Sequence, residues 1–145
     1  MKGDIKMSQE LQNLLNQIVT TPNEIDGIMI FDPKQALSLY RNTQYDKERH
    51  GDELFENYDE IAGALSGVHH ITDTLSEFGK SSQRGDLQYA VIQLSNGILV
   101  LYFLTINQEP VVVAFISGTP EGLGLLLKHS QKNISDIEKK LKELL

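Results

Sequence analysis

The chain has 145 residues, of which 40% are hydrophobic and 23% charged, and its formal net charge is −7 at pH 7. This length suits one domain with its own core, and the negative charge argues against a nucleic-acid surface, which needs clustered Lys and Arg. The absence of cysteine excludes disulfides, thiol nucleophiles and zinc sites built on sulfur. No stretch approaches the ~18 apolar residues of a membrane span, so we expect a cytoplasmic protein.

The first residues predict a tail followed by a helix. Residues 1–7 are polar and are expected to form a flexible N-terminal tail, with a single domain over residues 8–145. Ser8 is a suitable N-cap for a helix that ends near Thr20, because the apolar residues after it follow the three-four spacing of one buried helix face.

A β-hairpin is predicted next. The apolar, β-branched run Ile25–Phe31 and the alternating stretch Ala36–Thr43 flank the turn residues Asp32-Pro33, which is typical of two antiparallel strands. Residues 44–52 are charged and have no periodicity, so they indicate a surface loop.

A long amphipathic helix is predicted from Asp52 to Phe78, and Gly79 is expected to end it, because glycine readily adopts the left-handed conformation of a helix terminator. One apolar stripe is expected to lie on the sheet; it consists of Leu54, Tyr58, Ile61, Leu65, Val68, Thr72 and Leu75. Gly63 and Gly67 lie nearly opposite, beside a second row formed by Ala64, Ile71 and Phe78. A glycine inside a helix costs about 1 kcal/mol relative to alanine, so we expect another backbone to approach this face. The alternative is an exposed face on which the glycines have no role.

Three short strands follow this helix, over Leu87–Leu94, Ile98–Thr105 and Val111–Ser117. The turns between them are predicted at Ser95-Asn96-Gly97 and at Ile106–Glu109. The second and third strands are nearly continuous apolar runs, which is typical of central strands with both faces covered. The first strand, within Asp86–Leu94, mixes glutamines with apolar residues. We expect it at the sheet edge, where it stays open unless another chain pairs with it.

The last helix has a clear start signal in Thr119, Pro120 and Glu121, which suit the N-cap and the first turn. The capping-box spacing of Ser135–Glu138 leaves open whether residues 133–145 form a separate helix. This stretch is locally basic through Lys132, Lys139, Lys140 and Lys142. Its apolar stripe could dock on its own domain or on a partner, and its own domain is favoured.

No reaction centre is predicted. Adjacent residues such as His69 and His70 lie about 100° apart on a helix and converge poorly on a metal. The acidic residues of 52–60 are explained by the positive end of the helix dipole. Residues 118–124 are glycine-rich but lack the Gly-Lys-Ser/Thr ending of a phosphate loop. We therefore expect no catalytic residue, no cofactor, no metal site and no enzymatic activity.

The order of elements resembles the Roadblock family, which includes dynein light chains, bacterial polarity regulators that act on a Ras-like GTPase, and subunits of lysosomal Rag scaffolds. The resemblance covers residues 8–130 and is carried by the long middle helix that ends in glycine, the three-strand meander and the helix entry Pro120-Glu121-Gly122-Leu123-Gly124. The chain departs from the family at Asp32-Pro33-Lys34-Gln35, where members often carry Asp-Gly, and in its loop 44–52.

The resemblance implies a single α/β (α+β) domain with a five-stranded antiparallel sheet, the middle helix on one face and the terminal helices on the other. It also implies a homodimer in which the first meander strand pairs with its symmetry mate and the two middle helices pack together. The interface residues expected on this basis are Gly63, Ala64, Gly67, Ile71, Leu87, Tyr89 and Val91.

The function implied by the resemblance is that of a non-enzymatic scaffold or regulator of a small Ras-like GTPase, acting as a homodimer or with a Roadblock paralogue. A ligand-sensing α/β module is the main alternative, and it predicts an apolar cavity between sheet and helix. A profilin-like or longin-like interaction domain without a GTPase partner is a further alternative.

Overall fold

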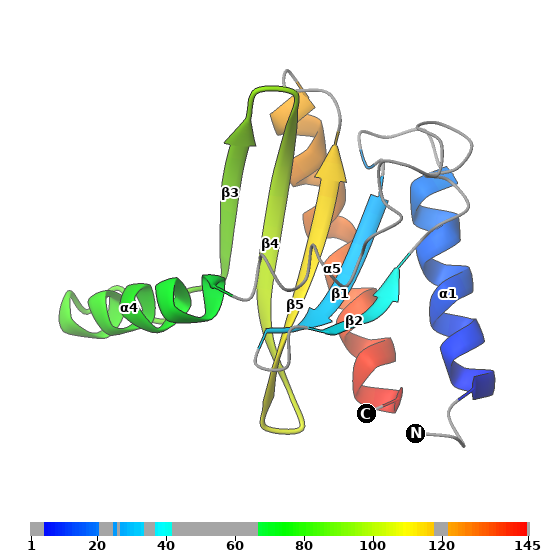
Figure 1. Cartoon of the computed structure of the whole chain (residues 1–145), viewed down its shortest axis with the longest axis horizontal. Coiled ribbons are helices and arrows are strands. Elements are labelled where there is room, and N and C mark those ends of the chain that lie inside the picture. Colours follow the sequence, from blue (N-terminus) through cyan, green and yellow to red (C-terminus); the bar gives the residue numbers. More distant parts are fainter. Residues whose placement is uncertain are drawn as a thin grey trace.

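The computed structural model describes residues 5–20, 25, 27–33, 37–41, 67–117 and 122–144, and Figure 1 shows how they are arranged. Their elements, in chain order, are α1 (Ile5–Thr20), β1 (Gly27–Asp32), β2 (Leu37–Arg41), α4 (Val68–Ser81), β3 (Tyr89–Leu94), β4 (Gly97–Ile106), β5 (Glu109–Ser117) and α5 (Leu123–Leu144). The strands are antiparallel throughout. The predicted α+β class with an antiparallel sheet is thus confirmed.

The described strands form one five-stranded sheet in the order β2-β1-β5-β4-β3. β5 lies at its centre and β4 beside it, as their apolar runs predicted. β3 lies at one edge and, among the described strands, pairs with β4 alone, so its predicted edge position is confirmed. β2 forms the other edge.

The two meander turns form where they were predicted. Gly97 pairs with Leu94, so the loop of the β3–β4 hairpin is Ser95-Asn96. In the β4–β5 turn, the central residues Asn107 and Gln108 have positive φ angles of 51° and 69°. Positive φ at both central residues is the requirement of a type I′ turn, whose twist matches that of the flanking strands.

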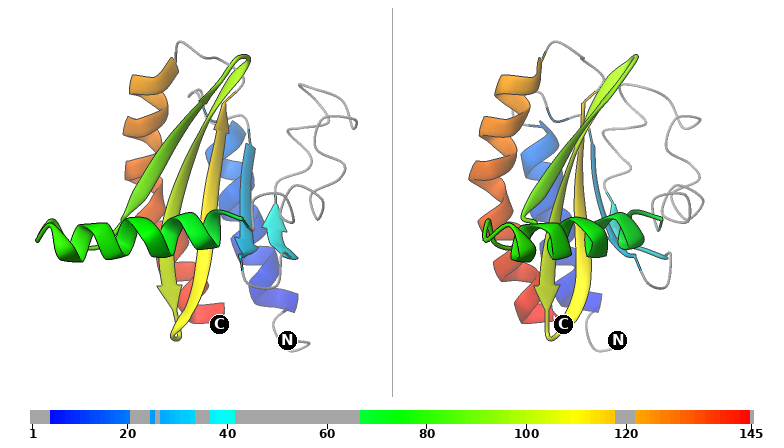
Figure 2. Two further views of the ribbon diagram at one scale, coloured as in Figure 1. Left: turned by 60° about the vertical axis from the view of Figure 1, so that its left-hand side comes forward. Right: turned by 90° about the vertical axis from the view of Figure 1, so that its left-hand side faces the viewer.

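Apolar side chains are buried on both faces of the sheet. α1 and α5 lie together on one face (Figure 2), where they form the main core with alternate strand residues such as Ile28, Ile30, Val100, Val113 and Phe115. The opposite face carries a second buried cluster, made of Met29, Phe31, Leu101, Val112 and Ala114. Burial on both faces explains why β4 and β5 lack the alternation of a half-exposed strand.

One buried hydrogen bond fastens α5 to the sheet. The Tyr102 hydroxyl of β4 lies 2.9 Å from the Ser130 hydroxyl of α5. Ser130 donates its own proton to the Leu127 carbonyl at 3.1 Å, so Tyr102 donates to Ser130. Burial raises the pKa of Tyr102, which keeps its hydroxyl protonated and able to donate.

Two predicted helix boundaries are wrong, and the question left open about the last helix is answered. α1 begins at Ile5 rather than at Ser8, so residues 5–7 of the predicted tail are helical. α4 passes through Gly79 and ends at Ser81. α5 is continuous to Leu144, because its buried side continues through Ile137 and Leu141, and no separate helix begins at residue 133. The predicted start residues Thr119, Pro120 and Glu121 lie outside the described part of the chain.

Replacing Tyr102 by Phe removes the hydroxyl but keeps the ring, which stacks edge-on against Phe115 at 5.7 Å. We expect Tyr102→Phe to lower the free energy of unfolding by about 1 kcal/mol, the usual contribution of one buried hydrogen bond. Chemical denaturation measures this difference. Tyr89→Phe is the matched control, because Tyr89 is 38% exposed, and it should change stability much less. Equal effects of the two substitutions would contradict the role of the buried bond.

A candidate association surface on α4 and β3

The described part of α4 projects beyond the β3 edge of the sheet (Figures 1 and 2), and none of the described strands or helices packs extensively against it. The prediction that one stripe of this helix lies on the sheet is therefore wrong for the described residues, and its member Leu75 is 42% exposed. Helical periodicity identifies an apolar face but not the surface that buries it. The other stripe residues Leu54, Tyr58, Ile61 and Leu65 lie outside the described residues.

A tight turn connects α4 to the segment that leads to β3. The backbone N–H groups of Arg84 and Gly85 both donate to the Gly79 carbonyl, at 2.7 and 3.1 Å. Gly85 adopts a φ of 93°, which favours glycine. A Cβ atom on Gly79 would collide with the Gly85 carbonyl oxygen. Gly79 is thus needed for the close approach of the returning chain, and not as the helix terminator that the sequence predicted.

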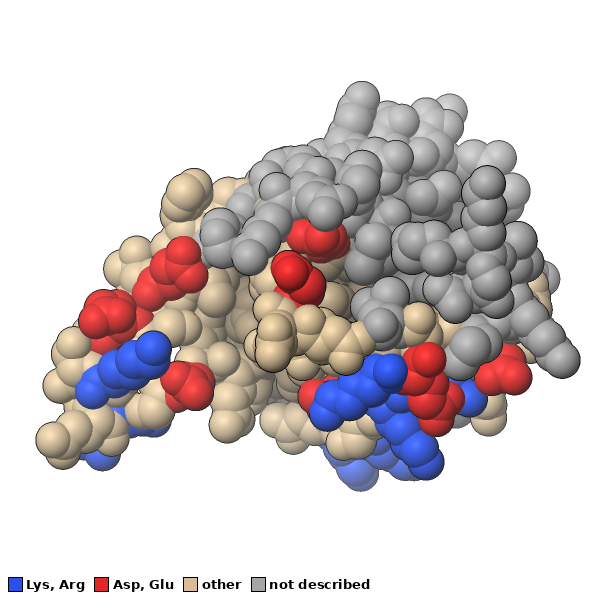
Figure 3. Space-filling model, turned by 90° about the horizontal axis from the view of Figure 1, so that it is seen from below, with Lys and Arg blue, Asp and Glu red and all other residues tan. Residues whose placement is uncertain are grey.

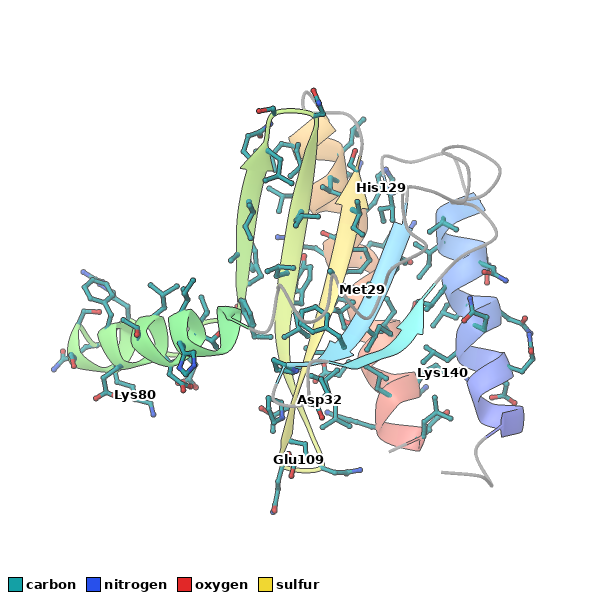
Figure 4. All side chains as sticks on the ribbon, in the orientation of Figure 1. Met29, Asp32, Lys80, Glu109, His129 and Lys140 are labelled. Atoms are coloured by element: carbon teal, nitrogen blue, oxygen red, sulfur yellow. The ribbon has the colours of Figure 1, made fainter. Side chains whose placement is uncertain are left out.

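α4 exposes an apolar stripe. Ile71, Leu75 and Phe78 are 58%, 42% and 68% exposed, and their spacing places them on one side of the helix. Lys80 points away from the direction in which β3 extends (Figure 4), and at about 100° per residue it lies about 180° around the helix from Ile71. The stripe therefore faces the corner between α4 and β3.

The outer edge of β3 supplies the second half of this corner. The Gln88 carbonyl accepts a hydrogen bond from the Phe103 N–H at 3.1 Å, so Gln88 faces β4. Because residues of an antiparallel strand alternate in direction, the outward backbone groups belong to Tyr89, Val91 and Gln93. No described strand pairs with them. The side chains of Tyr89 and Val91 are 38% and 39% exposed.

We call this corner the α4–β3 surface: Ile71, Leu75, Phe78, Tyr89, Val91 and Gln93. Three residues of the expected interface, Ile71, Tyr89 and Val91, lie in it. Of the others, Leu87 is half-buried just before β3, and Gly67 is exposed at the start of α4. Gly63 and Ala64 lie outside the described residues. Sequence reasoning missed Leu75, although its four-residue spacing from Ile71 was the available signal.

A groove of about 820 Å³ lies beside this surface, where α4, the connector to β3, the end of β4 and α5 approach one another. Its lining includes the charged residues Lys80, Asp86 and Glu138. Apolar residues such as Leu104, Val112 and Ile134 line it as well, so the groove is of mixed polarity. Within the described residues, no three His, Cys, Asp or Glu side chains are grouped to hold a metal ion. No described helix is long and apolar enough to cross a membrane.

Comparisons with known proteins identify the fold. No protein-family model matches the sequence, and no curated protein is detectably similar to it. The gliding protein MglB of Thermus thermophilus matches with a TM-score of 0.69 at 13% identity, over 94% of this chain and 92% of that chain. A structure of MglB in a tetrameric arrangement matches with a TM-score of 0.70 at 13% identity, over 96% of this chain and 93% of that one.

A Roadblock/LC7 domain from Streptomyces avermitilis also matches, with a TM-score of 0.53 at 18% identity, over 90% of this chain and 97% of that chain. At these identities the likeness concerns the fold. The chain has the Roadblock fold, as the resemblance of its sequence implied.

The Gly79 turn can be tested by substitution. We expect Gly79→Ala to lower the free energy of unfolding by about 1–3 kcal/mol, because its Cβ would displace the Gly85 carbonyl. Gly124→Ala in α5 is the matched control, since nothing lies within 4 Å of its added Cβ. Alanine is the better helix former, so Gly124→Ala should leave stability unchanged or raise it. Thermal and chemical unfolding compare the two variants, and an unaltered Gly79→Ala protein would contradict the close approach.

Proposed function

We propose that this chain is a cytoplasmic, non-enzymatic homodimeric scaffold or regulator that binds a small Ras-like GTPase. The observation that carries the proposal is the α4–β3 surface, in which a strand edge unpaired by any described strand meets an exposed apolar helix side at one corner. The Roadblock fold supports the same interpretation, because the resemblance implies association through these two elements.

Antiparallel pairing of β3 with β3 of a second copy would satisfy both halves of the surface. The outward N–H and C=O groups of Tyr89, Val91 and Gln93 would find strand partners, and the two sheets would become continuous. The second copy would also lie beside the exposed stripe of α4. Complete burial of an Ile, Leu or Phe side chain contributes about 1.5–3 kcal/mol, and these residues are roughly half exposed, so each would add about 1 kcal/mol. A two-fold interface is self-complementary, so each contact would occur twice.

The GTPase partner is proposed from the resemblance. Roadblock proteins commonly serve as platforms for small GTPases, and some stimulate hydrolysis by reorganising the switch region of the GTPase without inserting an arginine. Either activation or tethering is consistent with the absence of a predicted reaction centre in this chain. A Roadblock paralogue could take the place of the second copy.

Light scattering after size exclusion tests the dimer. We expect the wild-type chain to elute as a dimer and Val91→Pro to elute as a monomer, because proline removes an outward N–H and leaves the β3–β4 bonds intact. Val91→Thr keeps the N–H and is the matched control.

Phe78→Ser tests the helix half of the surface in the same assay. We expect it to raise the dimer Kd about thirtyfold, because about 1 kcal/mol of apolar burial is lost in each of the two symmetric contacts. Glu77→Ser changes the neighbouring position, which faces away from the stripe, and should have no such effect. A wild-type monomer at micromolar concentration would refute the proposed dimer.

Binding to GTPases is tested separately with a panel of purified Ras-like GTPases, each loaded with GDP or with a non-hydrolysable GTP analogue. We expect at least one to bind in a nucleotide-dependent manner, because a regulator must distinguish the two switch conformations. Single-turnover hydrolysis then distinguishes an activator, which raises the rate, from a tether, which does not. Absence of binding in both states would remove the GTPase and leave the dimer standing.

A further inference from the structure

We propose that the outward side of α5 is a docking surface for an anionic lipid bilayer. Four exposed lysines follow one side of this 22-residue helix: Lys128, Lys132, Lys139 and Lys142. At about 100° and 1.5 Å per residue they lie within an arc of about 80° and along a line of about 21 Å. The buried residues Ile137 and Leu141 occupy the opposite side of the helix. We call these four residues the lysine stripe.

The lysine stripe stands out against the charge of the rest of the chain. Five of the 13 basic residues and three of the 20 acidic residues of the chain lie in α5, which gives this helix a net charge of +2 within a chain of −7. The remaining residues therefore carry −9. Positive charge is concentrated on one helix of an acidic protein, which is the pattern of a local electrostatic contact surface.

The acidic residues near the stripe are mostly occupied. Lys140 pairs with Glu10 of α1 at 3.3 Å and with Glu143 at 3.6 Å. Lys142 pairs with Glu138 at 3.5 Å. Among the described residues, no carboxylate pairs with Lys128, Lys132 or Lys139. In the view from below, Lys and Arg side chains lie in two groups, and Asp and Glu side chains lie beside both of them (Figure 3).

The described side chains of the neighbouring helix α1 carry a single charge, the carboxylate of Glu10. The exposed residues of α1 include the uncharged amides Gln9, Asn13 and Gln17, and its Glu10 is paired with Lys140. Among the side chains that the structure describes, α1 thus sets one paired carboxylate beside the five lysines of α5. Leu125 adds an apolar side chain, 49% exposed, one turn before the lysine stripe, where it can enter a headgroup layer.

The shape of the stripe favours a planar anionic surface over a small anion. The lysines are spread along the helix and do not converge on one point, so a phosphate-sized ligand would contact only one or two of them. This step rests on the proposed homodimer: antiparallel β3–β3 pairing has its two-fold axis perpendicular to the sheet, so both α5 helices lie on the same face. A bilayer contacts both stripes at once, and the two contacts reinforce each other.

Sedimentation with lipid vesicles tests the proposal. We expect the full chain to sediment with phosphatidylcholine vesicles that contain phosphatidylserine, and not with phosphatidylcholine alone. Binding should disappear at high salt, because the Debye length shrinks from about 10 Å at 0.1 M to about 3 Å at 1 M. Absence of binding to the phosphatidylserine vesicles at low salt would overturn the proposal.

Matched variants assign the binding to α5. Lys132→Gln with Lys139→Gln removes two charges from the stripe, and we expect the partition coefficient to fall at least about fivefold per lysine. Lys80→Gln with Arg84→Gln removes the same charge from exposed positions outside α5 and should have little effect. An equal loss in both double variants would overturn the assignment, since it would reflect net charge alone.

Two further experiments distinguish a bilayer from an acidic protein partner, and the bilayer contact from the dimer. A polyglutamate peptide that binds through Lys132 and Lys139, when the vesicles do not bind, would assign the stripe to an acidic protein and overturn the bilayer proposal. The Val91→Pro variant separates this inference from the proposed dimer. If the wild-type chain is a dimer that does not bind the vesicles, only the bilayer contact is refuted. If it is a monomer that binds them through the lysines, only the dimer is refuted.

Discussion

The backbone edge of β3, with which no described strand pairs, is the constraint on which the rest of the molecule depends. A free strand edge attracts other chains, and proteins usually protect it with charge, proline, a bulge or a short length. The opposite edge shows one such device, because the ladder of β2 with β1 is interrupted by a register shift at Ile30/Phe31. The β3 sequence YAVIQL contains neither a charge nor a proline, and its ladder to β4 has an unbroken register. The two edges therefore differ in kind, and β3 is the one suited to pairing.

The helix next to this edge also exposes a surface that a partner would cover. α1 and α5 complete one face of the sheet, whereas α4 projects past the edge with its apolar stripe uncovered by the described elements. The turn at Gly79 and Gly85 joins this helix to the segment that leads to β3, so helix and strand remain adjacent. One partner of two-fold symmetry can cover the stripe and extend the sheet in a single contact, which is why we interpret the two features together.

Strand positions were predictable from the sequence because their signals are local. The apolar runs placed β4 and β5 inside the sheet, and the glutamines of β3 placed it at the edge. The packing of α4 was not predictable, since the same periodicity serves a helix on its own sheet and a helix on a partner. Gly79 illustrates a second limit: the sequence shows a glycine near a helix end, but the contact with Gly85, six residues later, depends on how the chain returns. Ser135 illustrates a third, because the continuous apolar side of α5 outweighs a local capping signal.

α1 and α5 differ in the polar side chains on their outer sides, and this difference indicates that the lysines of α5 do more than solvate the helix. Both helices cover the same face of the sheet, and both need polar side chains on their outer sides. α1 meets this need with amides such as Gln9, Asn13 and Gln17, so burial alone does not demand charge on this face. Solubility does not demand it either, because a net charge of −7 already keeps the chains apart. Lys128, Lys132 and Lys139 have no paired carboxylate among the described residues, so they require another reason, and attraction to an anionic surface supplies one.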